Sequence, residues 1–216
     1  MNLFTPLSWS DSGFILTGVL NTIYISVVAI LVGSVLGLII GFIRAESNKP
    51  VNFLLGSFLD VLRSVPLIIQ LILFSTFVGV MGYPMSPFLA GSIVLSLYTM
   101  SFMSEVFRSG FDSVPVGMVQ ASRSLGLSYF QTVRHIRIPI GMKAVFPSWI
   151  GVALSVIKDS ALVSVIGYME LLRTSEQLIS RTQQPLMILI GVGMFYFMIS
   201  YPLSRYGKYV ERKMEI

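Results

Sequence analysis

Long apolar stretches dominate the pattern of hydrophobic and polar positions along the chain. A membrane-spanning helix needs about 20 mostly apolar residues. Five stretches meet that length: 16–43, 53–80, 87–107, 145–166 and 185–204. The pattern therefore predicts an all-α, polytopic membrane protein with five transmembrane helices, in which residues 1–216 form a single transmembrane domain.

The distribution of lysine and arginine predicts the orientation of these spans. Basic residues cluster after the first, third and fifth spans, whereas the connections on the opposite side carry only Arg173 and Arg181. Cytoplasmic loops hold an excess of basic residues. We therefore expect the N-terminus outside and the C-terminus in the cytoplasm.

Composition narrows the chemistry that the chain can perform. Hydrophobic residues make up 54% of the chain and charged residues only 12%, which leaves too little polar sequence for a soluble catalytic domain. Cysteine is absent and His135 is the single histidine, so Cys-type zinc sites and histidine clusters are excluded. We expect no catalytic residue, no metal and no cofactor in this chain. The net charge of +5 fits loops that face anionic lipid, and we expect no nucleic-acid partner.

Small residues in the first span indicate close helix packing. Gly33, Gly37 and Gly41 recur every four residues and therefore share one helix face. Such a face lets another helix approach closely. The sequence thus predicts that this span is packed against a neighbouring helix, a feature of many bundles that carries no information on function.

The segment 108–143, between the third and fourth spans, combines a polar composition with helix signals. Pro115 suits a first helical turn and Gly126 a helix stop, so a short helix is predicted over 116–125. Ser128 and Gln131 have the spacing of a capping box, which predicts a second helix that ends before Pro139. This element either rests on lipid headgroups or protrudes to receive force from a partner protein.

Polar residues at membrane depth are costly and usually face partners or a water-filled path. Lys158, Asp159 and Ser160 lie past the middle of the fourth span. Adjacent Lys and Asp point about 100° apart on a helix, so they do not pair cleanly with each other. One interpretation places them on a path for a zwitterionic solute. The other has them snorkel to the interface or pair with charged residues of neighbouring helices.

Several motifs in order resemble the permeases of ABC importers for polar amino acids. Gln120-Ala121-Ser122 with Gly126, Ile136 and Pro139 is similar to the family's cytoplasmic signature, although Gln120 and Ser122 stand where Glu and Ala are usual. The resemblance extends from about residue 16 to the C-terminus. It includes Arg63-Ser64-Val65-Pro66-Leu67 with Gln70, the segment 105–108, and the segment 158–167.

The resemblance implies roles for particular residues and partners. The segment 108–143 would form a coupling helix that docks on a separate ATPase through Gln120, Ala121, Ser122, Gly126, Ile136 and Pro139. The substrate path would involve Lys158, Asp159, Ser160, Arg63 and Gln70, and Glu170, Arg173 and Glu176 would meet an external solute-binding protein. A second permease, identical or homologous, and two ATP-binding subunits that hold ATP and Mg²⁺ complete the expected assembly.

The resulting hypothesis is a multi-pass permease subunit of the bacterial cytoplasmic (inner) membrane that imports polar amino acids and hydrolyses no ATP itself. No phosphate-binding loop occurs in the sequence, because Gly207-Lys208 lacks both the first glycine and the following hydroxyl. The alternatives are an ATP-independent channel or ion-coupled carrier, and a scaffold subunit whose half of the passage binds nothing. The sequence does not identify the amino acid.

Overall fold

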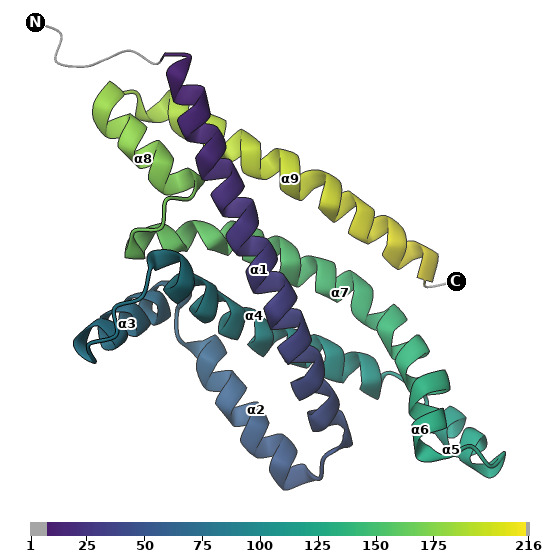
Figure 1. Cartoon of the computed structure of the whole chain (residues 1–216). Coiled ribbons are helices and arrows are strands. Elements are labelled where there is room, and N and C mark those ends of the chain that lie inside the picture. The colour runs from purple at the N-terminus through teal and green to yellow at the C-terminus, as the bar shows by residue number, and fades with distance from the viewer. Residues whose placement is uncertain (1–7, 215–216) are drawn as a thin grey trace, which may run out of the picture. The chain divides into compact units, whose positions relative to one another are not determined.

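The computed structural model describes residues 8–214, and these residues form helices and no strands (Figure 1). The long helices are α1 (Ser10–Glu46), α4 (Pro87–Asp112), α7 (Ile138–Asp159) and α9 (Pro185–Met214). Shorter helices connect them: α2 (Lys49–Ser64), α3 (Leu67–Val80), α5 (Val116–Ser124), α6 (Tyr129–Thr132) and α8 (Leu171–Thr182). A π-helical turn, η1 (Val133–Arg137), precedes α7, and a 3₁₀ helix, η2 (Ser160–Ile166), follows it.

The described helices group into two compact units. One unit contains the residues up to Leu31, Val65–Ser96 and Leu154–Leu203. The other contains Val32–Ser64, Leu97–Ala153 and the residues from Ser204 onward. The chain enters each unit several times, so each one is built from segments that are distant in the sequence.

Membrane-length helices agree with most of the predicted spans. Among the described residues, four helical runs are long and apolar enough to cross a bilayer: Asp11–Glu46, Pro87–Asp112, Tyr129–Ile166 and Pro185–Lys213. The pair α2 and α3 counts as a fifth span if it is taken as one broken helix. The chain is therefore an all-α polytopic membrane protein with four to five candidate spans.

The prediction of one continuous helix over 53–80 is wrong. Helix α2 ends at Ser64 and α3 begins at Leu67 with Pro66 as its N-cap. Proline has no backbone N–H to donate, and it disfavours helical geometry in the residue before it. Apolar character continues across the break, so hydropathy alone does not reveal it.

The glycine face of α1 is packed as predicted. A β-carbon at Gly33 would lie 2.6 Å from Thr99, and one at Gly37 would lie 2.4 Å from the Met103 β-carbon. At Gly41 the backbone oxygen of Ser104 would be 2.7 Å away. These distances are too short for a methyl group, so the glycines let the α1 and α4 backbones touch.

Buried aromatic and apolar side chains fill the unit that contains this contact. Met103, Phe107, Phe111 and Val145 form its core, and Phe42 packs on Phe111 edge to face. Trp149 at its margin donates its Nε1–H to the Ser34 hydroxyl at 2.8 Å, which satisfies the indole at membrane depth. This core joins α1, α4 and α7.

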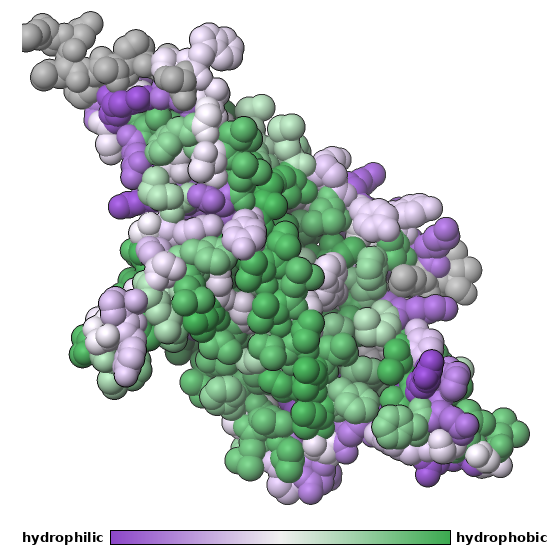
Figure 2. Space-filling view, viewed as in Figure 1, coloured by the Kyte–Doolittle hydropathy of each residue, from purple (hydrophilic) through white to green (hydrophobic). Residues whose placement is uncertain are grey.

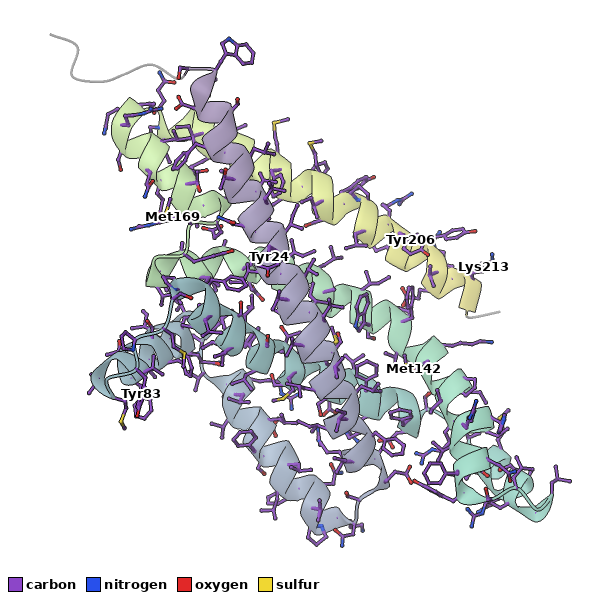
Figure 3. All side chains as sticks on the ribbon, in the orientation of Figure 1. Tyr24, Tyr83, Met142, Met169, Tyr206 and Lys213 are labelled. Carbon is purple, nitrogen blue, oxygen red and sulfur yellow. The ribbon has the colours of Figure 1, made fainter. Side chains whose placement is uncertain are left out.

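Side-chain hydrogen bonds hold the segment before α8 against α1 in the other unit. Asn21 Nδ2 donates to the carbonyl oxygen of Met169, the residue labelled in Figure 3, at 2.7 Å. The backbone N–H of Leu171 donates to Thr22 Oγ1 at 3.0 Å. The Tyr168 hydroxyl donates to the Asn21 carbonyl at 3.2 Å. Because these groups are half-buried or buried, their pairing specifies where this segment lies.

Large apolar side chains remain exposed along the outer faces of the long helices. Figure 2 shows hydrophobic residues over the visible face of α1. Only 6% of the most apolar 18-residue stretch of α9 is buried. A helix that exposes this much hydrocarbon is stable in an apolar surrounding, which is the expected state of a membrane span.

Candidate functional site

The polar segment between α4 and α7 folds as a hairpin of short helices (residues 116–137), which we call the coupling hairpin after the role that the sequence resemblance leads us to expect. Helices α5 and α6 lie side by side at the start of α7 (Figure 1). Gly126 turns the chain with φ of +85°, a left-handed conformation that favours glycine. Ser128 and Gln131 form the predicted capping box. The predicted helix, glycine turn and second helix are therefore confirmed.

Helix α6 ends at Thr132, before Pro139 as predicted, but helical geometry continues beyond it through η1 into α7. The π-helical turn η1 leads directly into α7, and the N–H of Ile138 donates to the carbonyl of Val133. Pro139, which has no N–H to donate, then lies at the start of α7, directly after this π-helical turn. The hairpin and α7 thus form one continuous helical run.

The residues of the cytoplasmic signature have different exposures. Gln120, Ala121 and Pro139 are exposed, and Ile136 is half-buried. Ser122 is buried, and its hydroxyl lies 3.0 Å from the Thr132 hydroxyl of α6. Large apolar side chains also remain exposed on the hairpin: Val116, Met118, Leu125 and Phe130. Ser122 therefore holds the two helices together, while Ala121 and its exposed neighbours form the outer surface.

Three arginines surround the carboxylate of Glu105 in α4. Arg44 from α1 donates to it at 2.9 Å, Arg63 from α2 lies 4.0 Å away, and Arg108 forms an ion pair with it. Arg63 also pairs with Asp60. The i, i+3 spacing of Asp60 with Arg63 and of Glu105 with Arg108 is typical of pairs within one helix. It did not indicate Arg44, which is 7% exposed and comes from a distant segment.

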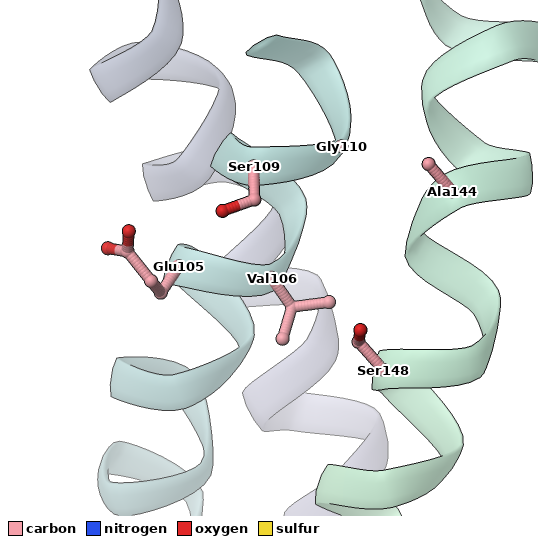
Figure 4. A pocket seen from close by; sticks show the side chains of 6 residues that line it. All are labelled: Glu105, Val106, Ser109, Gly110, Ala144 and Ser148. Carbon is pink, nitrogen blue, oxygen red and sulfur yellow. The ribbon is translucent and has the colours of Figure 1, made fainter. Parts of the chain in front are cut away.

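A cavity of about 210 Å³ opens beside Glu105. Figure 4 shows Glu105 and Ser109 on α4, and Ala144 and Ser148 on α7. Because Arg44 and Arg108 already neutralise the carboxylate, the cavity offers polar oxygens without an unpaired negative charge. This arrangement resembles a structural charge network more than a cation-binding site.

The predicted substrate-path residues of the fourth span lie where α7 changes to the 3₁₀ helix η2. Lys158 is exposed, Asp159 is half-buried, and Ser160 is buried with its hydroxyl donating to the Ile157 carbonyl at 2.7 Å. Within the described residues neither Lys158 nor Asp159 forms an ion pair.

Gln70 in α3 closes the gap left by the proline break. Its Nε2 donates to the Val65 carbonyl oxygen at 2.8 Å. The helix is broken at Pro66, so the Gln70 side chain satisfies a carbonyl at the end of the preceding segment. Helix α3 packs against η2, so the helix that carries Gln70 lies beside the one that begins at Ser160. Arg63 lies in the Glu105 network described above.

The predicted docking residues separate into one buried and two exposed side chains. Glu170 is fully buried as the N-cap of α8, and its carboxylate accepts from the N–H groups of Leu172 and Arg173 at 2.8 and 2.7 Å. Burial raises the pKa of Glu170 to about 7, although both backbone hydrogen bonds oppose the shift. Arg173 and Glu176 form an exposed pair at 3.2 Å.

Burial removes Glu170 from any surface that a partner touches directly. The sequence analysis did not predict helix α8, because its 12 residues are too few and too polar for a span. A signal existed, since an acidic residue followed by an amphipathic run is typical of a helix start. The analysis likewise gave no role to Asp11 of α1, which pairs with Arg181 of α8 at 2.5 Å.

No metal site is present in the part of the chain that the structure describes. Residues 8–214 contain no group of three or more His, Cys, Asp or Glu side chains placed to hold an ion.

Comparisons with known proteins agree with the fold and the order of these elements. The family model described as "Binding-protein-dependent transport system inner membrane component" matches residues 33–216. The arginine transport system permease ArtQ of Bacillus subtilis is 29% identical, with 100% of this chain and 99% of that protein covered. The glutamine transport system permease GlnP of Escherichia coli is 29% identical over 96% of each chain.

A solved structure supports the same relationship. The crystal structure of an amino acid ABC transporter with histidines has a chain that superposes with a TM-score of 0.86 and 26% identity, covering 97% of this chain and 100% of that one. The likeness extends over nearly all of both chains.

Proposed function

The chain belongs to the family of binding-protein-dependent transport system inner membrane components, and we propose that it works as a permease subunit that couples an external ATPase to the uptake of polar amino acids such as glutamine or arginine. It is a multi-pass inner-membrane transport subunit and not the ATPase. The observation that carries the mechanism is the coupling hairpin, whose exposed tip is joined to long apolar helices.

The proposed orientation places the coupling hairpin in the cytoplasm. Five spans, with α2 and α3 together as the second, bring the N-terminus outside and the C-terminus inside. The basic residues after the first, third and fifth spans support this orientation. The hairpin then meets a partner that carries ATP and Mg²⁺, because ATP hydrolysis is expected on a separate chain.

The coupling step is a docking of the hairpin tip into the ATPase. Ala121 and Gln120 are exposed, and the neighbouring apolar side chains of Val116 and Met118 offer surface to bury. Gln120 supplies hydrogen bonds without a charge. Nucleotide-driven closure of two ATPase subunits would move the hairpin and shift the permease toward its outward-facing state.

The proposed substrate path passes the junction of α7 and η2. Lys158 and Asp159 form no ion pair within the described residues, although the Lys158 charge acts on Asp159, and a zwitterionic amino acid offers complementary charges to both. Ser160, Gln70 and Arg63 are proposed to line or support the same path. A second permease, identical or homologous, would supply the other wall.

The proposed docking face for an external solute-binding protein uses the exposed side of α8. Arg173 and Glu176 are 44% and 47% exposed, so their charges are available to a partner. Glu170 contributes indirectly, because it caps the helix that carries them.

The experiment that tests the coupling step is Gly126→Val. A β-carbon at Gly126 meets nothing within 4 Å, so the change strains only the left-handed turn. A β-branched residue there costs about 1–3 kcal/mol, which favours a different turn and displaces the hairpin tip. We expect the complex with ATPase and binding protein to lose most substrate-stimulated uptake in proteoliposomes while the permease still purifies as a folded protein.

The control is Gly151→Val, at an exposed helical glycine of α7 outside the hairpin with equally open surroundings, and it should keep coupled uptake. It adds the same side chain without a positive φ. Normal coupled turnover in Gly126→Val would contradict the proposed role of the hairpin.

A further inference from the structure

The last residue of α1 holds both ends of the segment formed by α6 and η1. The Tyr129 hydroxyl, at the start of α6, donates to Glu46 Oε2 at 2.5 Å. Arg137, at the end of η1, forms an ion pair with Glu46 Oε1. Glu46 is remote in sequence from the coupling hairpin, so these contacts are a side-chain connection between the hairpin and α1.

The last turn of α1 also contacts α4 and α2, through Arg44 on the helix face opposite Glu46. Residues two apart on an α-helix point about 200° apart, so Arg44 and Glu46 face opposite directions. Arg44 donates to Glu105 of α4 at 2.9 Å and to Asn52 of α2 at 3.1 Å. Only Ser47 and Asn48 separate α1 from α2. A displacement of Glu46 therefore acts on α1 and on the start of α2 together.

The ion pair of Arg137 and Glu46 is partly shielded from water, whereas the hydrogen bond from Tyr129 to Glu46 lies at an exposed position. Arg137 is 15% exposed and Glu46 is 23% exposed, whereas both members of the outer pair Arg173 and Glu176 are more than 40% exposed. Removing one partner of a shielded pair leaves a poorly solvated charge, so such a pair resists separation. When the hairpin moves, Glu46 is expected to follow it.

We propose that Glu46 is the positioning residue that carries movement of the coupling hairpin into α1 and α2. The covalent chain leads from the hairpin only into α4 and α7, and Glu46 adds a direct connection to α1. The inference rests on the proposed function, because it assumes that the ATPase moves the hairpin. It adds the residue through which that movement reaches a helix outside the hairpin's own chain neighbours.

The test measures ATP hydrolysis and amino-acid uptake in the same proteoliposomes, which contain the full complex of permease, ATPase and binding protein. Glu46→Gln keeps the acceptor for Tyr129 and removes the ion pair with Arg137. Because coupling energies are commonly 1–3 kcal/mol, we expect uptake to fall by about fivefold or more while ATP hydrolysis stays within about twofold of the parent. The ratio of solute to ATP would fall accordingly.

Asp112→Asn is the matched control. It also turns a carboxylate paired with an arginine into an amide, but the pair of Arg108 and Asp112, at 2.8 Å, lies within α4. We expect its ratio of solute to ATP to equal that of the parent. The double variant Glu46→Arg with Arg137→Glu restores an opposite pair and is expected to recover uptake, whereas Glu46→Arg alone is not.

The outcomes separate this inference from the proposed function. If the parent complex shows no nucleotide-dependent uptake, the proposed function fails. If uptake by the parent depends on nucleotide and Glu46→Gln has the same ratio of solute taken up to ATP hydrolysed, the inference about Glu46 is overturned and the proposed function stands. It is also overturned if Glu46→Gln no longer binds the ATPase, because Glu46 would then only maintain the fold of the hairpin.

Discussion

A single buried carboxylate, that of Glu170, is expected to make the stability of the protein depend on pH. It is fully buried at the N-terminus of α8, and Tyr168, Glu176 and Tyr196 are the titratable groups that influence it or are influenced by it. Two backbone N–H groups favour its charged form, yet burial prevails and raises its pKa. The carboxyl group thus binds a proton more tightly in the folded protein than in the unfolded chain.

The expected consequence is a loss of stability as the pH rises. Between the unfolded pKa of 4.5 and the folded value of about 7, the folded state holds more protons, so the free energy of unfolding falls with increasing pH in this window. At 1.36 kcal/mol per pKa unit the full loss is about 3 kcal/mol. Thermal unfolding in detergent at pH 5, 6, 7 and 8 should show a decline in Tm that Glu170→Gln flattens.

Glu176→Gln serves as the comparison, because that carboxylate is exposed and lies on the same helix. Its Tm should still decline with rising pH, only slightly less than that of the parent, because the Glu176 charge adds a smaller contribution to the Glu170 pKa shift than burial does. An equally steep decline in the Glu170→Gln variant would show that another group causes the pH dependence.

Helix packing at the scale of the element depends on the glycines of α1. Gly37 has no room for a β-carbon, since one would lie 2.4 Å from that of Met103. Gly37→Ala must therefore push α1 away from α4, and overpacking of this kind typically costs about 1–3 kcal/mol. We expect a lower Tm in detergent and a smaller yield of folded protein.

Gly13→Ala provides the contrast on the same helix. No atom lies within 4 Å of the added carbon, and alanine favours the helix by up to about 1 kcal/mol. Its Tm should equal or exceed that of the parent. If Gly37→Ala melts at the parent temperature, the close contact between α1 and α4 does not limit stability.

Capping and turn residues predicted the helices and the turn of the hairpin, whereas contacts between residues distant in the sequence were not predicted. The capping box of Ser128 and Gln131 and the turn at Gly126 depend on residues within one helical turn, so their spacing is sufficient evidence. Continuous hydropathy over 53–80 predicted one span and obscured the break at Pro66. A helix was expected to end before Pro139, and helical geometry instead continues through the π-helical turn η1 into α7.

In the candidate site, too, contacts within one helix follow from the sequence spacing and contacts between helices do not. The intrahelical pairs of Glu105 with Arg108 and of Asp60 with Arg63 follow from i, i+3 spacing. The approach of Arg44 to Glu105, which spans 61 positions in sequence, depends on how α1 packs on α4. No pattern within one chain segment encodes such a pairing.

At the scale of the whole molecule, the open question is whether this chain's own charges contact the solute. Lys158 and Asp159 lie without ion-pair partners in the described part of the chain, at the point where α7 tightens into η2. A zwitterion on the path would supply the opposite charges transiently. A scaffold subunit would have no need of unpaired charges at membrane depth, since each costs about 2.5–3.5 kcal/mol on insertion scales.

Separate replacements Lys158→Gln and Asp159→Asn distinguish these roles. If both side chains line the path, each variant should reduce uptake by the full complex about tenfold or more, which corresponds to about 1.4 kcal/mol, while basal ATP hydrolysis is retained. Lys208→Gln, an exposed residue of α9, removes a positive charge away from η2 and should leave uptake unchanged. Parent-level uptake in both variants would assign solute contact to the second permease and leave this chain the role of transmitting force.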